Sequence, residues 1–191
     1  MMEIPADSET ALIACAQQGD RGAYSELVRR HSTSVINLVY RMCGDLALAE
    51  DAAQEAFIKA WLHLPSYRQQ GSFKNWLYRI AINTALDVLR RQPQLAASGV
   101  EDLEFNDPQP DPEVQLIHQQ QAELVQQAVM SLPPASRAVV VLREYKSLSY
   151  QEIAAVLDIP TGTVMSRLSY ARGLLRQKLA DKLPRKDVAY A

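Results

Sequence analysis

The sequence has few of the features on which enzymes and membrane proteins depend. It contains only seven glycines, and no stretch of the GxGxxG or GxxxxGK kind that would cradle phosphates is present. Three scattered histidines and two cysteines make no cluster with metal-ligand spacing. The apolar runs are far shorter than the roughly 20 residues of a membrane span. The sequence does not begin with positive charges followed by an apolar stretch, so we expect no secretory signal.

The composition is that of a globular protein. Hydrophobic residues make up 48% of the 191 residues, which is enough to build a core and excludes a wholly disordered chain. The length allows one domain or two small ones. Cys15 and Cys43 lie within apolar helical patterns. Because the chain has the character of a cytoplasmic protein, we expect two buried thiols rather than a disulfide.

The charge is uneven along the chain, although the formal net charge is only −2. Residues 1–28 carry a net charge of −4, residues 29–91 carry +4, residues 92–124 carry −7 and residues 125–191 carry +5. Basic blocks can neutralise phosphates, and an acidic segment between them repels DNA and favours a cationic surface. Such charges can equally be solvated surface, so this pattern alone leaves both interpretations open.

Residues 1–91 have the pattern of a compact helical domain. Four stretches with helical spacing of apolar residues are separated by residues that cap or end helices. These residues are Gly19, Asp20, Gly44, Asp45, Pro65 and Ser72. The third stretch has an inward stripe of small and aromatic residues, in which alanines let a neighbouring helix approach closely. The stripe consists of Ala49, Ala52, Ala53, Ala56, Phe57, Ala60, Trp61 and Leu64.

Residues 92–112 interrupt this pattern with four prolines and five acidic residues, which favours an extended linker. Helical patterns resume over residues 113–131, 134–145, 149–157 and 161–182, and no useful alternating strand pattern appears. We therefore predict an all-α fold of two small helical domains, residues 1–91 and 113–183, joined by the acidic, proline-containing linker 92–112. Residues 184–191 form a short tail.

The second domain carries the pattern of a helix-turn-helix. Ser149 and Glu152 make a capping box, and residues 158–162 form a short turn before the next helix. That helix has an apolar side and a polar, basic side of the kind that enters the major groove of DNA. The apolar side consists of Val164, Leu168, Ala171, Leu174, Leu175 and Leu179. The outward side consists of Ser166, Arg167, Ser169, Tyr170, Arg172 and Arg176. The alternative is a helical hairpin with solvated arginines.

The first domain carries two further surfaces. Asp51, Gln54, Glu55 and Ile58 share one helix face, on which two carboxylates could dock a basic partner helix; a solvated face is the alternative. The fourth helix and the loop before it mix aromatic, cationic and amide side chains, a combination that follows a nucleic-acid backbone and stacks on unpaired bases. The alternative places Phe73 and Trp76 in the core.

In their order along the chain, these stretches resemble the extracytoplasmic-function group of bacterial sigma factors. Asp51-Ala-Ala-Gln54-Glu55-Ala-Phe57 resembles the polymerase-binding motif of that family, and residues 73–83 resemble its helix for the −10 promoter element. Ser131-Leu-Pro-Pro resembles the start of its second domain, and residues 149–168 resemble its −35 reader. The resemblance spans about residues 8–182.

The resemblance implies a role for each surface. Binding of core RNA polymerase falls to Asp51, Gln54 and Glu55. Contacts with the −10 element, including a pocket for a flipped base, fall to Tyr67, Arg68, Phe73, Lys74, Arg79, Asn83, Asp87, Arg90 and Arg91. Contacts with the −35 element fall to Arg143, Lys146, Thr163, Ser166, Arg167, Ser169, Tyr170, Arg172 and Arg176. Met165 and Tyr170 stand where many relatives carry a basic residue, which weakens any transfer of −35 sequence preference.

The resemblance also implies partners. These are core polymerase, promoter DNA (duplex at −35, single-stranded at −10) and an anti-sigma factor, with no cofactor, metal, small-molecule substrate or membrane insertion. The acidic linker would pass through the polymerase channel that RNA later occupies, and would oppose DNA binding by the free chain. The alternatives are an ordinary helix-turn-helix regulator, a sigma mimic that sequesters an anti-sigma factor, and an enzyme, for which no converging catalytic residues are evident.

Overall fold

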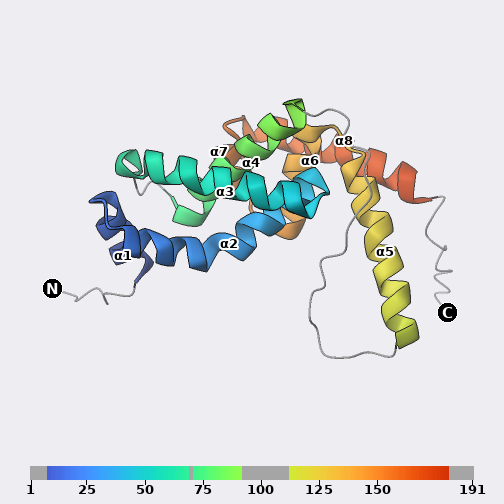
Figure 1. Cartoon of the computed structure of the whole chain (residues 1–191). Helices are drawn as coiled ribbons and strands as arrows, with labels where there is room; N and C mark the ends of the chain where they lie inside the picture. The colour runs from blue at the N-terminus through green and yellow to red at the C-terminus, as the bar shows by residue number, and fades with distance from the viewer. Residues whose placement is uncertain (1–7, 69–70, 92–111, 181–191) are drawn as a thin grey trace.

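The computed structural model describes residues 8–68, 71–91 and 112–180, with the helical backbone alone for residues 112–120. Within these ranges there are eight α-helices and no strand, so the all-α prediction is confirmed (Figure 1). The α-helices are α1 (Glu9–Gln17), α2 (Arg21–Cys43), α3 (Leu46–His63), α4 (Phe73–Arg91), α5 (Pro112–Met130), α6 (Pro134–Val140), α7 (Tyr150–Leu157) and α8 (Thr161–Ala180). A 3₁₀ turn (Leu64–Ser66) follows α3, and a π-helical turn (Val141–Tyr145) follows α6.

The residues predicted to cap the N-terminal helices do so. The carboxylates of Asp20 and Asp45 accept hydrogen bonds from amides in the first turns of α2 and α3. The Ser72 hydroxyl accepts one from an amide in the first turn of α4. Gly44 ends α2 with φ at 78°, a left-handed conformation that favours glycine. The helix ends therefore lie within about two residues of those predicted.

Helices α2, α3 and α4 pack against one another, and α1 lies along α2. The predicted alanine stripe of α3 faces this core and is buried at Ala49, Ala52, Ala53, Ala56 and Ala60. Phe57 and Trp61 are only half-buried, because they lie at the edge of the stripe beside Tyr24. The ring centroids of Trp61 and Tyr24 are 4.8 Å apart.

Helices α7 and α8 form the predicted helix-turn-helix. Both hydrogen bonds of the capping box between Ser149 and Glu152 are present. Asp158 ends α7 in the left-handed conformation, with φ at 55°. The first half of α8 buries Val164, Leu168 and Ala171. The predicted core residues of its second half, Leu174, Leu175 and Leu179, are only half-buried, because the short α7 ends before them and α5 borders the last turns.

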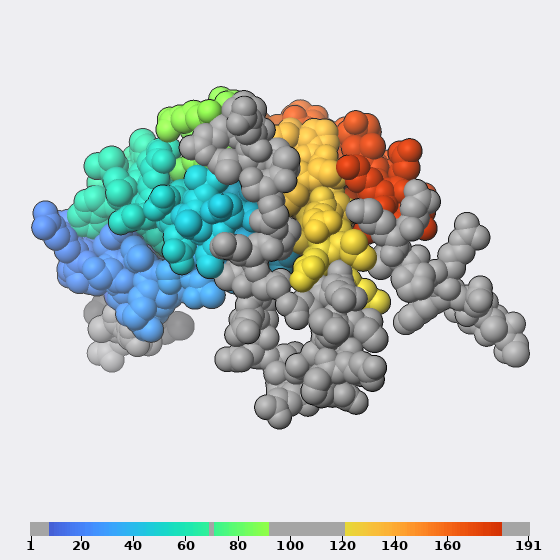
Figure 2. Space-filling view, turned by 45° about the vertical axis from the view of Figure 1, so that its right-hand side comes forward, coloured from blue at the N-terminus to red at the C-terminus, as the bar shows by residue number. Residues whose placement is uncertain are grey.

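The two predicted domains share one continuous core. Helices α5 and α6 contact α2, and α6 and α7 contact α4. Figure 2 shows the described segments after residue 121, in yellow to red, beside the N-terminal helices in blue to green. Between them lies Arg137, whose side chain is 1% exposed. Its guanidinium donates hydrogen bonds to the backbone oxygens of Met42, Met130 and Leu132. The predicted linker, residues 92–112, and the tail lie outside the described residues, apart from Pro112 at the start of α5.

The two cysteines differ from each other. Cys43 is buried, as predicted, and burial raises the pKa of its thiol to about 11. The prediction for Cys15 is wrong, because its side chain is exposed. Helix α1 has only nine residues and buries Ile13 and Ala16 against α2, which leaves Cys15 on its outer side. Both thiols are free.

In the part of the chain that the structure describes, no helix has both the length and the apolar character to cross a membrane.

Candidate nucleic-acid interface

The structure brings the predicted polymerase-binding residues together on one face of α3. Asp51 and Gln54 are exposed, and Glu55 is half-exposed. The Glu55 carboxylate forms an ion pair with Lys59 at 2.7 Å. The same helix continues with Ile58, which is 56% exposed, so the carboxylates border an apolar surface. This face can accept a partner that combines cationic and apolar side chains.

Tyr67 and Phe73, which are predicted for the −10 pocket, form an aromatic cluster with Trp76. The ring centroid of Tyr67 lies 5.6 Å from that of Phe73 and 4.8 Å from that of Trp76. Tyr67 and Phe73 are buried, while Trp76 is half-buried. Burial raises the pKa of the Tyr67 hydroxyl, which donates a hydrogen bond to the Gly71 carbonyl at 3.1 Å. Tyr67 and Phe73 therefore support the surface from within rather than present flat rings to solvent.

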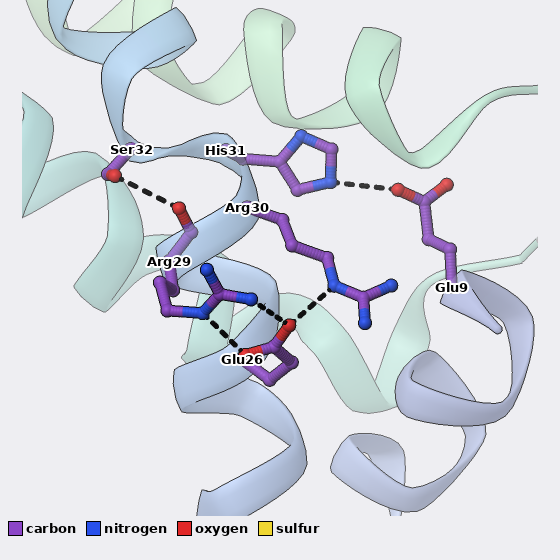
Figure 3. A network of polar contacts seen from close by, with 6 residues as sticks. All are labelled: Glu9, Glu26, Arg29, Arg30, His31 and Ser32. Carbon is purple, nitrogen blue, oxygen red and sulfur yellow. Dashed lines mark hydrogen bonds and ion pairs between the residues drawn. The ribbon is translucent and has the colours of Figure 1, made fainter. Parts of the chain in front are cut away.

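Two sets of polar contacts lie near this cluster, and one of them, between Glu9 and His31, joins α1 to α2 (Figure 3). His31 Nε2 lies 2.8 Å from a carboxylate oxygen of Glu9, and its ring centroid lies 5.4 Å from that of Phe73. On the next turn, hydrogen bonds from Arg29 and Arg30 lower the pKa of Glu26 to about 2. The contact with Glu9 therefore holds the ring of His31 beside the aromatic cluster.

A cavity of 280 Å³ lies beside the cluster. It is lined by Tyr67, Arg68, Gly71, Ser72, Asn75, Trp76 and Arg79, and by Ala155 and Val156 of α7. Sequence reasoning missed Asn75, which donates a hydrogen bond to Glu152 of α7 at 3.2 Å. Its spacing was the signal: Asn75, Arg79 and Asn83 follow one another at intervals of four residues along one side of α4.

The other predicted −10 residues of α4 are mostly exposed. Asn83 and Arg91 are exposed, and Lys74 is exposed with its ammonium 5.6 Å from the Tyr78 ring centroid. Asp87 forms an ion pair with Arg90 at 2.6 Å. Because of that pair, the negative charge of Asp87 faces solvent next to a positive one.

The outer face of α8 is as predicted from the helical spacing. Ser166, Ser169, Tyr170, Arg172 and Arg176 are exposed, while Thr163 and Arg167 are half-exposed. The Arg172 guanidinium contacts the Glu144 carboxylate at 3.1 Å, and this hydrogen bond raises the pKa of Arg172. Tyr170 is 56% exposed and Met165 is 55% exposed, so two large apolar surfaces lie among the serines and arginines.

Two predicted phosphate contacts are engaged inside the protein. Arg143 donates a hydrogen bond to the Leu148 carbonyl at 2.8 Å. Lys146 donates one to the Ser34 carbonyl of α2 at 2.9 Å. Burial, with the positive charges of Lys74 and Arg41 nearby, lowers the pKa of Lys146 to about 8. Their binding to DNA stays a prediction that, for Lys146, requires the bond to α2 to break.

No group of three or more histidine, cysteine, aspartate or glutamate side chains that could hold a metal ion occurs among the described residues.

Comparisons with known proteins agree with this arrangement. The family model of sigma-70 region 2 matches residues 27–93, and that of sigma-70 region 4 matches residues 122–175. The RNA polymerase sigma-H factor of Pseudomonas aeruginosa is 36% identical over 182 residues, which cover 91% of this chain and 94% of the relative. The ECF RNA polymerase sigma-E factor of Escherichia coli is 37% identical over 183 residues, which cover 90% of this chain and 94% of the relative.

Among solved structures, CnrH in complex with the cytosolic domain of CnrY superposes with a TM-score of 0.68 at 25% identity. The match covers 93% of this chain and 100% of CnrH. Both family models match, and the relatives are more than 30% identical over nearly their whole length. The chain therefore belongs to the extracytoplasmic-function (ECF) family of RNA polymerase sigma factors.

Proposed function

We propose that the chain directs core RNA polymerase to promoters and helps to open them. The observation that carries this proposal is the helix-turn-helix of α7 and α8, with a polar and basic outer face, in one chain with the carboxylate face of α3. A helix-turn-helix alone suits many transcription regulators. The α3 face gives a second binding surface, of the kind that a polymerase-bound factor needs.

At the −35 element, α8 enters the major groove. Its outward serines and arginines reach base edges and phosphates, and an arginine that contacts a guanine through two hydrogen bonds contributes about 1–3 kcal/mol of discrimination. Arg167 is the residue proposed for such a contact, because it is half-exposed on the outer side of α8 with no ion pair to Asp or Glu among the described residues. Arg143 and Lys146 would contact phosphate.

At the −10 element, α4 binds the single-stranded non-template DNA. Asn83 and Asp87 would face the bases, while Arg90 and Arg91 would follow the phosphates. The cavity between Arg68 and Trp76 would hold the flipped base. Holding the unpaired base keeps the strands apart, so opening needs no ATP.

On α3, Asp51, Gln54 and Glu55 would bind a basic helical surface of the large polymerase subunit. The exposed Ile58 would add apolar contact next to these polar ones. The working chain then has a polymerase and −10 domain (1–91), an acidic linker (92–112), a −35 domain (113–183) and a short tail. It acts in the cytoplasm, where polymerase acts, as a binding factor rather than an enzyme.

An anti-sigma factor is the expected regulatory partner. The solved relative CnrH is bound to the cytosolic domain of CnrY. A protein that wraps both sets of helices would withhold α3, α4 and α8 from polymerase and DNA together. Stress-induced release of such a partner would activate the chain.

The test is run-off transcription with bacterial core polymerase on a fragment that carries the chain's own upstream region. A discrete new transcript is expected, and its start site locates the −10 and −35 elements. The variant Asp51→Arg with Glu55→Arg should lose the transcript and co-elution with core polymerase while keeping its circular dichroism spectrum. The control places the same number of arginines on exposed positions of α5, as Gln121→Arg with Gln127→Arg, and should transcribe normally.

Other outcomes separate the alternatives. Co-elution without a transcript keeps the proposal and directs the search to other promoters. DNA binding without co-elution indicates an ordinary helix-turn-helix regulator. Loss of both indicates a sigma mimic.

A further inference from the structure

Helix α1 takes no part in the proposed contacts with polymerase or DNA, yet it is bound to the segment that leads into the base cavity. The side-chain amide of Gln17, the last residue of α1, donates to the Leu64 carbonyl at 3.1 Å and to the Tyr67 carbonyl at 2.8 Å. These partners lie 47 and 50 positions away in the sequence. A glutamine amide has two N–H groups, so both are used on this one segment.

The two carbonyls stand at the start and the end of the 3₁₀ turn that follows α3. Leu64 is the first residue of the turn, and Tyr67 directly follows its last residue. The Tyr67 amide also donates to the Leu64 carbonyl, at 3.0 Å. Because the peptide bond from Tyr67 to Arg68 is planar, holding the Tyr67 carbonyl also fixes the direction in which Arg68 leaves the turn. Arg68 lines the cavity proposed for the flipped base.

Glu9, in the first turn of α1, approaches the same aromatic cluster. Its carboxylate contacts His31, as Figure 3 shows, and the ring of His31 lies beside that of Phe73. Burial, and after it the negative charge of Glu9, raises the pKa of the Tyr67 hydroxyl. Both ends of α1 therefore act on the cluster, Gln17 through the backbone of Tyr67 and Glu9 through His31.

We propose that Gln17 is a positioning residue for promoter opening, which holds Tyr67 and Arg68 where the cavity can take an unpaired base of the −10 element. This inference rests on the proposed function of that cavity. Gln17 is half-buried and acts through the backbone of Tyr67, so it needs no contact with DNA. A 3₁₀ turn of three residues has poorer hydrogen-bond geometry than an α-helix, which is why its exit depends on a bond from outside.

The size of the effect follows from the two hydrogen bonds. A hydrogen bond between neutral groups shifts a conformational equilibrium by about fivefold, so losing both lowers the fraction of chains with a formed cavity by up to about 25-fold. The apparent affinity for DNA that places a base in the cavity falls by the same factor. DNA that lacks this base gains nothing from a formed cavity, so its affinity should stay unchanged.

Two substitutions at one position separate hydrogen bonding from packing, and both leave the proposed DNA-binding residues intact. Gln17→Met keeps the length and the helix propensity of the side chain and removes both donors. Gln17→Lys keeps donors, in an ammonium that can reach the same carbonyls. The matched controls are Gln18→Met and Gln18→Lys, which make the same changes at the exposed neighbouring residue.

The first measurement is binding of non-template-strand oligonucleotides to the complex of the chain with core polymerase, at fixed salt. The probes span the −10 element mapped by the run-off transcript, either intact or with one abasic site at each position in turn. In the parent, the abasic site that costs the most affinity marks the flipped base. Gln17→Met should bind the intact probe about 5- to 25-fold more weakly and the probe without that base as the parent does. Gln17→Lys should recover most of the loss, and both Gln18 variants should match the parent.

The second measurement is acrylamide quenching of Trp76 in a Trp61→Phe background, where Trp76 is the one tryptophan left in the chain. Because the ring of Tyr67 packs on Trp76, release of the turn in Gln17→Met should make Trp76 more accessible. Gln17→Lys should show a smaller rise, and the Gln18 variants none. Quenching needs neither DNA nor polymerase, so it reports on the placement of Tyr67 even where the transcription experiment fails.

Three results would overturn the proposal. In the first, Gln17→Met quenches and binds as the parent does. In the second, Trp76 becomes accessible while the intact and abasic probes lose affinity equally or not at all, so Gln17 supports the fold alone. In the third, Gln18→Met has the same effects as Gln17→Met. Failure of the proposed function is visible in the parent by itself: no abasic site then weakens binding, the cavity takes no base, and the role of Gln17 falls with it.

Discussion

Arg137 is the buried residue whose loss should cost the most stability. Its side chain is 1% exposed and donates hydrogen bonds to the carbonyls of Met42, Met130 and Leu132. Met42 belongs to the last turn of α2, where carbonyls lack partners within the helix. Met130 is the last residue of α5, and Leu132 lies in the connection between α5 and α6. One guanidinium therefore joins the end of α2 to the second set of helices.

The expected magnitude follows from these contacts. Arg137→Ala leaves three carbonyls without their donor and opens a cavity of the size of the lost side chain. Each orphaned buried acceptor costs about 1–3 kcal/mol. Burial of the charged guanidinium is itself unfavourable, and it lowers the pKa of Arg137. Removing the side chain relieves this desolvation cost. The net loss of unfolding free energy should be about 3–5 kcal/mol, because the cost of three orphaned acceptors is partly offset by this relief.

Urea denaturation followed by circular dichroism measures this loss. Arg137→Met fills most of the volume and restores no hydrogen bond, so the difference between Met and Ala gives the cavity cost. The exposed Arg176→Ala on α8 is the control and should stay within about 0.5 kcal/mol of the parent. A loss below about 1 kcal/mol for Arg137→Ala would refute the reasoning, since the three hydrogen bonds would then contribute nothing net.

Three further predictions concern other parts of the chain. Gly44→Ala and Gly19→Ala should each cost about 1–2 kcal/mol of stability, because both glycines have a left-handed φ. Thermal denaturation should show the larger loss for Gly44→Ala, since a Cβ at Gly44 would lie 2.8 Å from Met130, whereas a Cβ at Gly19 meets nothing within 4 Å. The Lys146 pKa of about 8 lies below its usual 10.5, so the unfolded Lys146 side chain binds more protons between these values. Its contribution to stability should therefore rise with pH across that window by about 1 kcal/mol after allowance for solvent screening. The difference in stability between the parent and Lys146→Met measures this rise, because the raised pKa of the Cys43 thiol acts in the opposite sense in both chains. We expect the exposed Met165 to pack on a thymine methyl group of the −35 element. Replacing that thymine by uracil should then weaken DNA binding by about 0.8 kcal/mol in the parent and leave binding by Met165→Ala unchanged. Competition binding on duplex DNA measures both.

The helices and their ends could be predicted from the sequence because local interactions determine them. Asp20, Asp45 and Ser149 cap helices through hydrogen bonds to residues two or three positions away, and these signals are visible in the sequence. The faces of α3 and α8 follow from helical spacing in the same way. Cys15 shows the limit, since a nine-residue helix offers too few turns to distinguish its buried side.

The contacts between the two sets of helices could not be predicted from the sequence. Arg79 and Asp158 lie 79 residues apart, and Lys146 and Ser34 lie 112 residues apart. Arg137 gives only a weak signal, as a single arginine before an apolar run. Its burial depends on carbonyls left free at the ends of two helices, and sequence periodicity carries no information about them.

The contacts between the two sets of helices differ in strength, and that difference bears on function. Around Arg137 the interface is buried and hydrogen-bonded to backbone, so removing one partner is costly. Where α7 meets α4, the ion pair of Arg79 and Asp158 is exposed, with side chains 45% and 80% accessible, and such pairs contribute little. In the proposed function of α4, the contact with α7 is therefore the one that separates at the lower cost, while the buried contacts around Arg137 hold the two sets of helices together.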